Sequence, residues 1–289
     1  GAADYRTPLV ILLSSNLVNL VLELLFVFVF EWGVAGSAWS TVIAQAGAGI
    51  AFVVVIRRHL APAVERRPSR AGMAPLLTAG RHLLLRVGSM LAVLSGATAI
   101  AARVDEPTLA AHQIAASILL FLALALDALA IPAQTLVADE LGRESIPAAA
   151  AVSGRVAWLS IVAGGILAVV VGVAAPLLPH AFTGDDAVAD RATAALVWLA
   201  IMLVPAAIAF AYDGVLIGAG DYRFLGWAAL AYLAAVTPLG LLVLPTGAGI
   251  GGIWSALALW MVLRAVVNHL RATRLLSTDR PSSLPTPAL

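Results

Sequence analysis

Long apolar runs, separated by short polar breaks, make up most of this chain. A helix that spans a membrane needs roughly 20 mostly apolar residues. Such runs predict eight helices, near residues 8–30, 35–57, 78–102, 108–137, 149–176, 191–217, 223–245 and 249–270. The breaks carry Gly, Pro and charged residues, which interrupt helices. The fourth run contains Pro132, so its helix is expected to kink or end early there. The pattern predicts an all-α polytopic membrane protein.

The composition agrees with this fold class and excludes several functions. Hydrophobic residues make up 62% of the chain and charged residues 11%, against roughly 45–50% and 25% in soluble domains. The absence of cysteine excludes disulfides and iron–sulfur clusters. The five histidines are scattered without metal-site spacing, and neither G-x-S-x-G nor H-E-x-x-H occurs. A net charge of +1 argues against a nucleic-acid partner. We therefore expect no enzyme, no cofactor and no metal site.

The arginines predict the orientation in the membrane. All 17 basic residues are arginines, and the break after the second run holds five of them: Arg57, Arg58, Arg66, Arg67 and Arg70. Because cytoplasmic loops are enriched in Arg and Lys, we expect that side to be cytoplasmic. Alternating sides then leaves only Arg103 and Arg191 outside. A cell-membrane protein with both ends of this chain in the cytoplasm is the expectation.

A short phrase occurs twice and indicates an internal repeat. GAADYR begins at Gly1 and GAGDYR at Gly218, 217 positions later. Trp39 and Trp254, each in a Gly-rich phrase, are 215 positions apart. Of the six predicted helices before the second copy, the last four, from about residue 78 to residue 217, belong to the same half as that copy, and none precedes the first copy. The repeat therefore predicts a twelve-helix parent with two parallel halves of six, as in several secondary transporters. The four missing helices are expected to come from an upstream segment.

This repeat gives the expected domain organisation. It comprises the last two helices of an amino-terminal lobe (1–57), a basic cytoplasmic linker (58–77), a six-helix carboxyl-terminal lobe (78–272) and a disordered cytoplasmic tail (273–289).

Six phrases resemble the multidrug and toxic compound extrusion (MATE) family, with most similarity to its branch named after the bacterial DNA-damage-inducible protein F. They are GAADYRTP, NLVNLVLELLF, WGVAGSAWSTVIAQ, HQIAASI, DALAIPAQTLVADELG and DGVLIGAGDYR. The resemblance implies a twelve-helix antiporter with two six-helix lobes around a central cavity. Such proteins export organic, often cationic, compounds in exchange for protons or sodium ions. The family's first four helices are absent from this sequence.

Glu23 is the first candidate for ion coupling, because an acid inside the membrane is a functional hypothesis by default. Asn16, Asn19 and Glu23 follow the i, i+3, i+7 spacing, so they share one helix face. A carboxylate beside amide oxygens can bind a small cation or hold a proton. The resemblance implies that Asn19 and Glu23 contribute to an amino-lobe cation site, whose usual carboxylate partner lies on a helix absent here. The alternative is a polar helix–helix contact.

Two further acids lie inside predicted helices. Asp127 is deep in the fourth, with Gln134 two turns later on the same face, and both are candidates for contact with substrate or cation. The alternative for Asp127 is an ion pair with Arg86 or Arg155. Asp213 lies near the cytoplasmic end of the sixth helix, and we expect it to hydrogen-bond helix termini or loop arginines there.

Other positions suggest shape and anchoring. Pro205 and Pro238 can kink helices at a cavity. His112, near the outer surface, is expected to be a capping or interfacial residue. Trp32, Trp39, Trp198 and Trp254 are expected to be anchors at the membrane interface.

The leading hypothesis is a secondary antiporter, apparently truncated, that takes small organic substrates. A lipid-linked saccharide flippase would favour arginine-lined cavities, whereas the deep charges here are acids and the arginines are expected to be peripheral. An inactive or partial transporter fragment is the remaining alternative.

Overall fold

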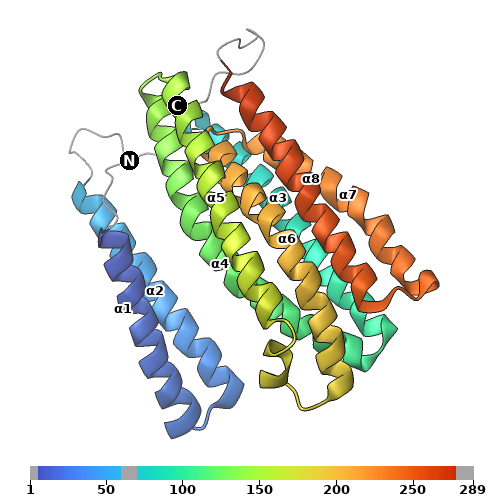
Figure 1. Cartoon of the computed structure of the whole chain (residues 1–289). Helices are drawn as coiled ribbons and strands as arrows, with labels where there is room; N and C mark the ends of the chain where they lie inside the picture. Colours follow the sequence, from blue (N-terminus) through green and yellow to red (C-terminus); the bar gives the residue numbers. More distant parts are fainter. Residues whose placement is uncertain (1–5, 60–69, 278–289) are drawn as a thin grey trace. The chain divides into compact units, whose positions relative to one another are not determined.

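The computed structural model describes residues 6–59 and 70–277. Eight helices in these ranges are long and apolar enough to cross a membrane, so the eight predicted spans are confirmed and the chain is a multi-pass membrane protein (Figure 1). Most of the first GA-x-DYR phrase, the middle of the predicted linker and most of the predicted tail lie outside the described residues. The contacts divide the chain into two compact units, Gly1–Pro68 and Ser69–Leu289.

The first unit is a helical hairpin. Helix α1 (Arg6–Leu24) runs directly into a π-helical turn (Leu25–Val29), and α2 (Gly33–His59) returns beside it. The hydroxyl of Ser15 donates to the carbonyl of Ala44 at 2.9 Å and ties the two helices together. The ring of Phe26, in the π-helical turn, lies 4.9 Å from that of Trp32, in the connection to α2, measured between centroids.

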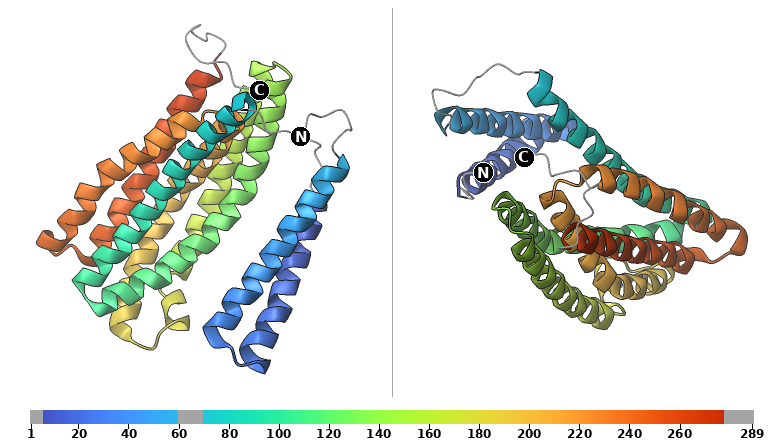
Figure 2. Two further views of the ribbon diagram at one scale, coloured as in Figure 1. Left: turned by 180° about the vertical axis from the view of Figure 1, so that it is seen from behind. Right: turned by 90° about the horizontal axis from the view of Figure 1, so that it is seen from above.

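The second unit is a bundle of six long helices. They are α3 (Arg70–Val104), α4 (Glu106–Gly142), α5 (Ile146–Ala174), α6 (Asp186–Gly218), α7 (Tyr222–Thr246) and α8 (Gly249–Leu275), with a short 3₁₀ helix (Leu178–Ala181) between α5 and α6. Helix α6 packs against α4, α5 and α8, and α3 packs against α7 (Figures 1 and 2). The central position of α6 explains why it carries the deepest apolar side chains of the unit, among them Leu196 and Leu203.

Glycines let α6 lie close to α4. A Cβ on Gly214 would collide with the backbone of Ala130, and a Cβ on Gly218 would collide with that of Gln134. These glycines are four residues apart, and so are their partners. This is the small-residue spacing that lets membrane helices approach closely.

Helix α4 continues without a break through Pro132 to Gly142, so the expectation that it ends early is wrong. Proline is tolerated inside membrane helices because neighbouring helices and local adjustments satisfy the freed backbone groups. The close contact with α6 on both sides of Pro132 supplies such a neighbour.

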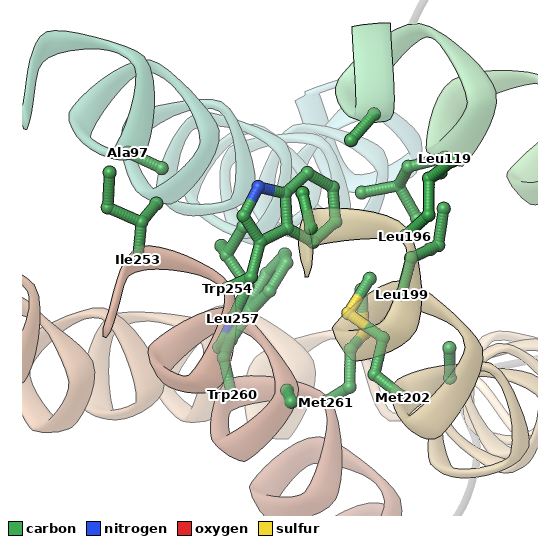
Figure 3. Packing of buried hydrophobic residues seen from close by; sticks show 14 of the residues in the cluster. Ala97, Leu119, Leu196, Leu199, Met202, Ile253, Trp254, Leu257, Trp260 and Met261 are labelled. Atoms are coloured by element: carbon green, nitrogen blue, oxygen red, sulfur yellow. The ribbon is translucent and has the colours of Figure 1, made fainter. Parts of the chain in front are cut away.

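The core of the second unit also overturns one interface prediction. Trp254 is fully buried, in a cluster with Leu119 of α4 and with Leu196 and Met202 of α6 (Figure 3). It is therefore a core residue and no interfacial anchor, because α8 presses this face of its first turns against α6 and α4.

Candidate functional site

Glu23 lies near the end of α1, where α2 comes back alongside it. Its Oε1 accepts a hydrogen bond of 2.9 Å from the hydroxyl of Ser37, in the second turn of α2. Sequence reasoning missed Ser37, although it lies in the GVAGSAWS phrase used for the repeat. The bond leaves the second carboxylate oxygen, Oε2, available to a proton or a cation.

Asn19 lies one turn before Glu23, and its side chain has an unused acceptor. The Oδ1 atom is buried and has no hydrogen-bond partner among the described residues. Buried polar atoms are nearly always hydrogen-bonded, so this oxygen is suited to a further donor or cation. Asn16 is exposed, so the structure brings Asn19 and Glu23 together with Ser37 but leaves Asn16 at the edge.

The backbone changes its winding next to this group. The π-helical turn Leu25–Val29 begins two residues after Glu23. Single π turns inside α-helices occur frequently at functional sites. The apolar sequence LFVFV gives no indication of this π-helical turn.

A second polar group, which we call the charge cluster, lies inside the six-helix unit. It consists of Arg86 (α3), Asp213 (α6), Tyr232 (α7), and Arg264 and Asn268 (α8). Arg86 and Arg264 both donate to Oδ2 of Asp213, at 2.5 Å and 2.6 Å. Asn268 donates to Oδ1 of Asp213 at 2.7 Å and accepts from the hydroxyl of Tyr232 at 2.9 Å. Three helices (α3, α6 and α8) thus meet at one carboxylate, and α7 joins the cluster through the bond from Tyr232 to Asn268.

The surroundings of the cluster keep Arg264 deep in the unit. Its side chain is only 3% exposed, and its guanidinium carbon lies 4.9 Å from the ring centroid of Trp260. A second aromatic ring, that of Phe210, lies 5.6 Å away. Aromatic faces attract guanidinium groups, so both rings help to retain this charge away from water.

The cluster corrects two predictions. Asp213 was expected to bind helix termini or loop arginines, but its partners are two arginines within membrane-spanning helices. The arginines were expected to be peripheral, but Arg86 and Arg264 are not. Because α3 and α8 lie far from α6 in sequence, periodicity could not pair them. The signal available was Arg264 with Asn268, two polar residues four apart in an apolar helix.

Asp127 and Gln134 remain open to their surroundings. Asp127 is half-buried and makes no hydrogen bond or ion pair to another described residue. Arg86 pairs with Asp213 instead, so the predicted pair with Arg86 is not formed, and no pair with Arg155 occurs in the described part. Asp127 is still close enough to the cluster for the charges of Arg86, Asp213 and Arg264 to act on it. Gln134 lies two helical turns further along the same face of α4 and is exposed.

The remaining candidates lie within helices that stay continuous. Pro205 is half-buried in α6 and Pro238 is exposed in α7, and neither ends its helix. His112 is not interfacial: it is buried, and its Nε2 lies 3.1 Å from the hydroxyl of Thr98.

Comparison with known proteins places this architecture in a family. The model of the family described as MatE matches residues 88–244, which is more than half of the chain. The chain belongs to the MatE family. This confirms the resemblance to multidrug and toxic compound extrusion proteins.

Relatives and solved structures extend the match beyond that segment. Protein DETOXIFICATION 42 of Arabidopsis thaliana is 30% identical over 94% of this MatE chain and 52% of its own length. DNA damage-inducible protein F of Escherichia coli is 26% identical over 92% of this chain and 59% of its own length. A Vibrio cholerae MATE transporter has the same fold, with a TM-score of 0.82 at 20% identity over 95% of this chain and 63% of its own. The chain thus spans about half the length of the Arabidopsis relative.

Proposed function

We propose that this chain is the eight-helix part of a twelve-helix secondary antiporter. The whole protein would export organic, often cationic, compounds across the cytoplasmic membrane in exchange for H⁺ or Na⁺. Membership of the MatE family supports transport as the activity. The remaining four helices would complete the amino-terminal lobe, of which α1 and α2 are the last two helices.

The environment of Glu23 carries the proposal for ion coupling. One carboxylate oxygen is held by Ser37, and the nearby amide oxygen of Asn19 is buried without a partner. Together the two oxygens could coordinate Na⁺, and the carboxylate could instead take up a proton. Binding there shifts the balance between outward-open and inward-open states only if the ion binds one state more tightly. The adjacent π turn is the backbone element that we expect to respond.

On the substrate side, Asp127 is the proposed contact for a cationic compound. Its carboxylate has no partner among the described residues and remains partly accessible. Gln134 adds an exposed amide on the same helix face. The Asp213 carboxylate is unsuited to this role because it is enclosed by its own arginines.

The test is efflux of ethidium from membrane vesicles under an imposed H⁺ or Na⁺ gradient. The eight-helix chain and the chain supplied with the four preceding helices are compared with Glu23→Gln variants. Glu23→Gln should abolish gradient-driven efflux, because the amide cannot exchange a proton or balance a cation. Glu31→Gln, in the exposed turn after α1, is the matched control and should leave efflux intact. Normal coupling in Glu23→Gln would refute the role of Glu23.

A lipid-linked saccharide flippase is the second candidate, and one observation favours it. The charge cluster holds two arginines, the partly buried Arg86 and the buried Arg264, against the single carboxylate of Asp213. This excess of positive charge suits a phosphate group better than peripheral arginines would. If the completed protein moves no organic cation but accelerates flipping of a fluorescent lipid-linked sugar, this candidate replaces the antiporter.

A further inference from the structure

Two hollows lie along the line where α3 and α7 pack side by side. At one end, a cavity of ≈ 170 Å³ is lined by α3, α7 and α8, with Arg103 among its lining residues. At the other end, an open hollow between α3 and α7 includes Arg81. Leu233 lines both, so the two hollows adjoin, and we call them together the α3–α7 groove.

The groove presents an apolar surface between its two ends. Ser89 and Thr237 are its only polar side chains besides the two arginines. Their hydroxyls donate to backbone carbonyls of their own helices, those of Leu85 and Leu233, at 2.7 Å each. Apolar cavities of about 150 Å³ stay dry and take up apolar molecules. The cavity beside Arg103 is close to this size, and the apolar lining of the groove suits a hydrocarbon chain.

The two ends carry positive charge without compensation. Arg81 and Arg103 are exposed, and neither makes an ion pair with another residue of the described ranges. They are 22 positions apart on α3, since 103 − 81 = 22, which corresponds to about 33 Å along a helix. The hydrocarbon core of a bilayer is about 30 Å thick. One guanidinium thus lies at the headgroup level of each leaflet.

We propose that the α3–α7 groove is a phospholipid-binding site. An acyl chain from each leaflet lies along the groove, and the lipid phosphates contact Arg103 at one end and Arg81 at the other. Gly96 helps to create the space, because a Cβ there would meet no atom within 4 Å. The charge and the length of the groove favour a lipid over a cationic substrate, which the arginines would repel. This inference does not depend on the proposed antiport activity.

The experiment uses the full chain purified in mild detergent and titrated with dioleoyl phosphatidylglycerol. Native mass spectrometry counts the lipid retained. Arg103→Gln and Arg81→Gln should each lower the affinity by about fivefold, the contribution expected of one arginine near an anionic lipid surface. Gly96→Leu should also lower retention, because its side chain fills the cavity. Arg155→Gln is the matched control: this exposed arginine of α5 lines neither hollow, and retention should not change.

Three outcomes would overturn the proposal. Equal losses in Arg103→Gln and Arg155→Gln would mean that the lipid is held by general charge. Competition by inorganic phosphate would identify an anion site that needs no acyl chain. Stoichiometric displacement of the lipid by ethidium would make the groove a substrate site. If Gly96→Leu does not fold, a lipid with a photoreactive acyl chain is crosslinked to the unmodified protein instead. The proposal requires the crosslinks to map to α3 and α7, and crosslinks elsewhere would refute it.

Discussion

Asp213 balances two guanidinium groups with a single carboxylate, so its removal would leave both arginines of the charge cluster without an ion pair. Both arginines donate to the same oxygen, and Asn268 occupies the other. Breaking a buried ion pair by removing one partner leaves an uncompensated charge and costs about 3–5 kcal/mol. Asp213→Ala should therefore lower the free energy of unfolding by about that amount, measured by thermal unfolding in detergent through tryptophan fluorescence.

The matched control for this prediction is Asp139. Its pair with Arg143 is exposed on both sides, and exposed pairs contribute about 1 kcal/mol or less. Asp139→Ala should thus change the unfolding temperature little. Similar losses in the two variants would contradict the claim that burial, and not pairing as such, gives Asp213 its importance.

Asp105 allows a prediction about pH, because it lies in the turn between α3 and α4. Its carboxylate accepts a 2.8 Å bond from the backbone amide of Thr108, and it pairs with Arg191. The hydrogen bonds from Thr108, and then the charge of Arg191, hold the pKa of this carboxyl below its ordinary value of 3.8. A native pKa lower than the unfolded one gives stability above the unfolded pKa that is lost as the pH falls through the native value.

Asp105→Asn should accordingly be less stable than the unmodified protein at neutral pH, and the difference should shrink as the pH falls below about 3.8. The measurement is the unfolding temperature of both proteins between pH 7 and pH 3. A difference that stays constant over this range would show that the charge of Asp105 contributes nothing.

At the scale of the helices, the close contact between α4 and α6 lies directly beside the charge cluster. Gly214 follows Asp213 directly, and its lack of a side chain lets α6 touch the backbone at Ala130. A methyl group there must push the helices apart, and overpacking typically costs about 1–3 kcal/mol. Gly214→Ala should therefore destabilise the unit by at least this amount in the same unfolding assay.

Gly154 of α5 provides the contrast, because a Cβ there would meet no atom within 4 Å. Replacing an unconstrained helical glycine by alanine stabilises by roughly 0.5–1 kcal/mol. The two Gly→Ala substitutions should thus have opposite signs. A stabilising Gly214→Ala would mean that α4 and α6 are not in close contact.

The helices themselves could be predicted from the sequence, whereas the partners of their polar residues could not. Each span can be recognised from one contiguous stretch of sequence, because it needs about 20 apolar residues in a row. The partner of Asp213 depends on which faces of α3 and α8 turn toward α6, and that follows from packing. The same reason explains Trp254, which has an interfacial position in the sequence but a place in the core. Asn19 and Glu23 were within reach of prediction because both lie on one helix face.

At the scale of the whole molecule, the ion pairs agree with the predicted alternation of sides. Arg191, near the start of α6, pairs with Asp105, in the turn before α4, and both lie on the side assigned to the outside. Arg271 donates to Asp221 at 2.6 Å, and both belong to the side assigned to the cytoplasm. Each pair lies at one end of the six-helix unit, so the helices that it connects must enter the membrane from the same side.

Because the chain contains no cysteine, a single introduced thiol reports the side of its own turn. Glu31→Cys and Gly184→Cys place one in turns predicted to face outward, and Glu144→Cys places one in a turn predicted to face the cytoplasm; all three positions are exposed. A membrane-impermeant maleimide added to intact cells should label the first two and should reach the third only after permeabilisation. The reverse labelling pattern would show that the orientation is opposite to the predicted one. The arginine-rich side would then lie outside, although Arg and Lys are normally enriched in cytoplasmic loops. Labelling of Glu31→Cys and Gly184→Cys from different sides would instead mean that one of the helices between them does not cross the membrane.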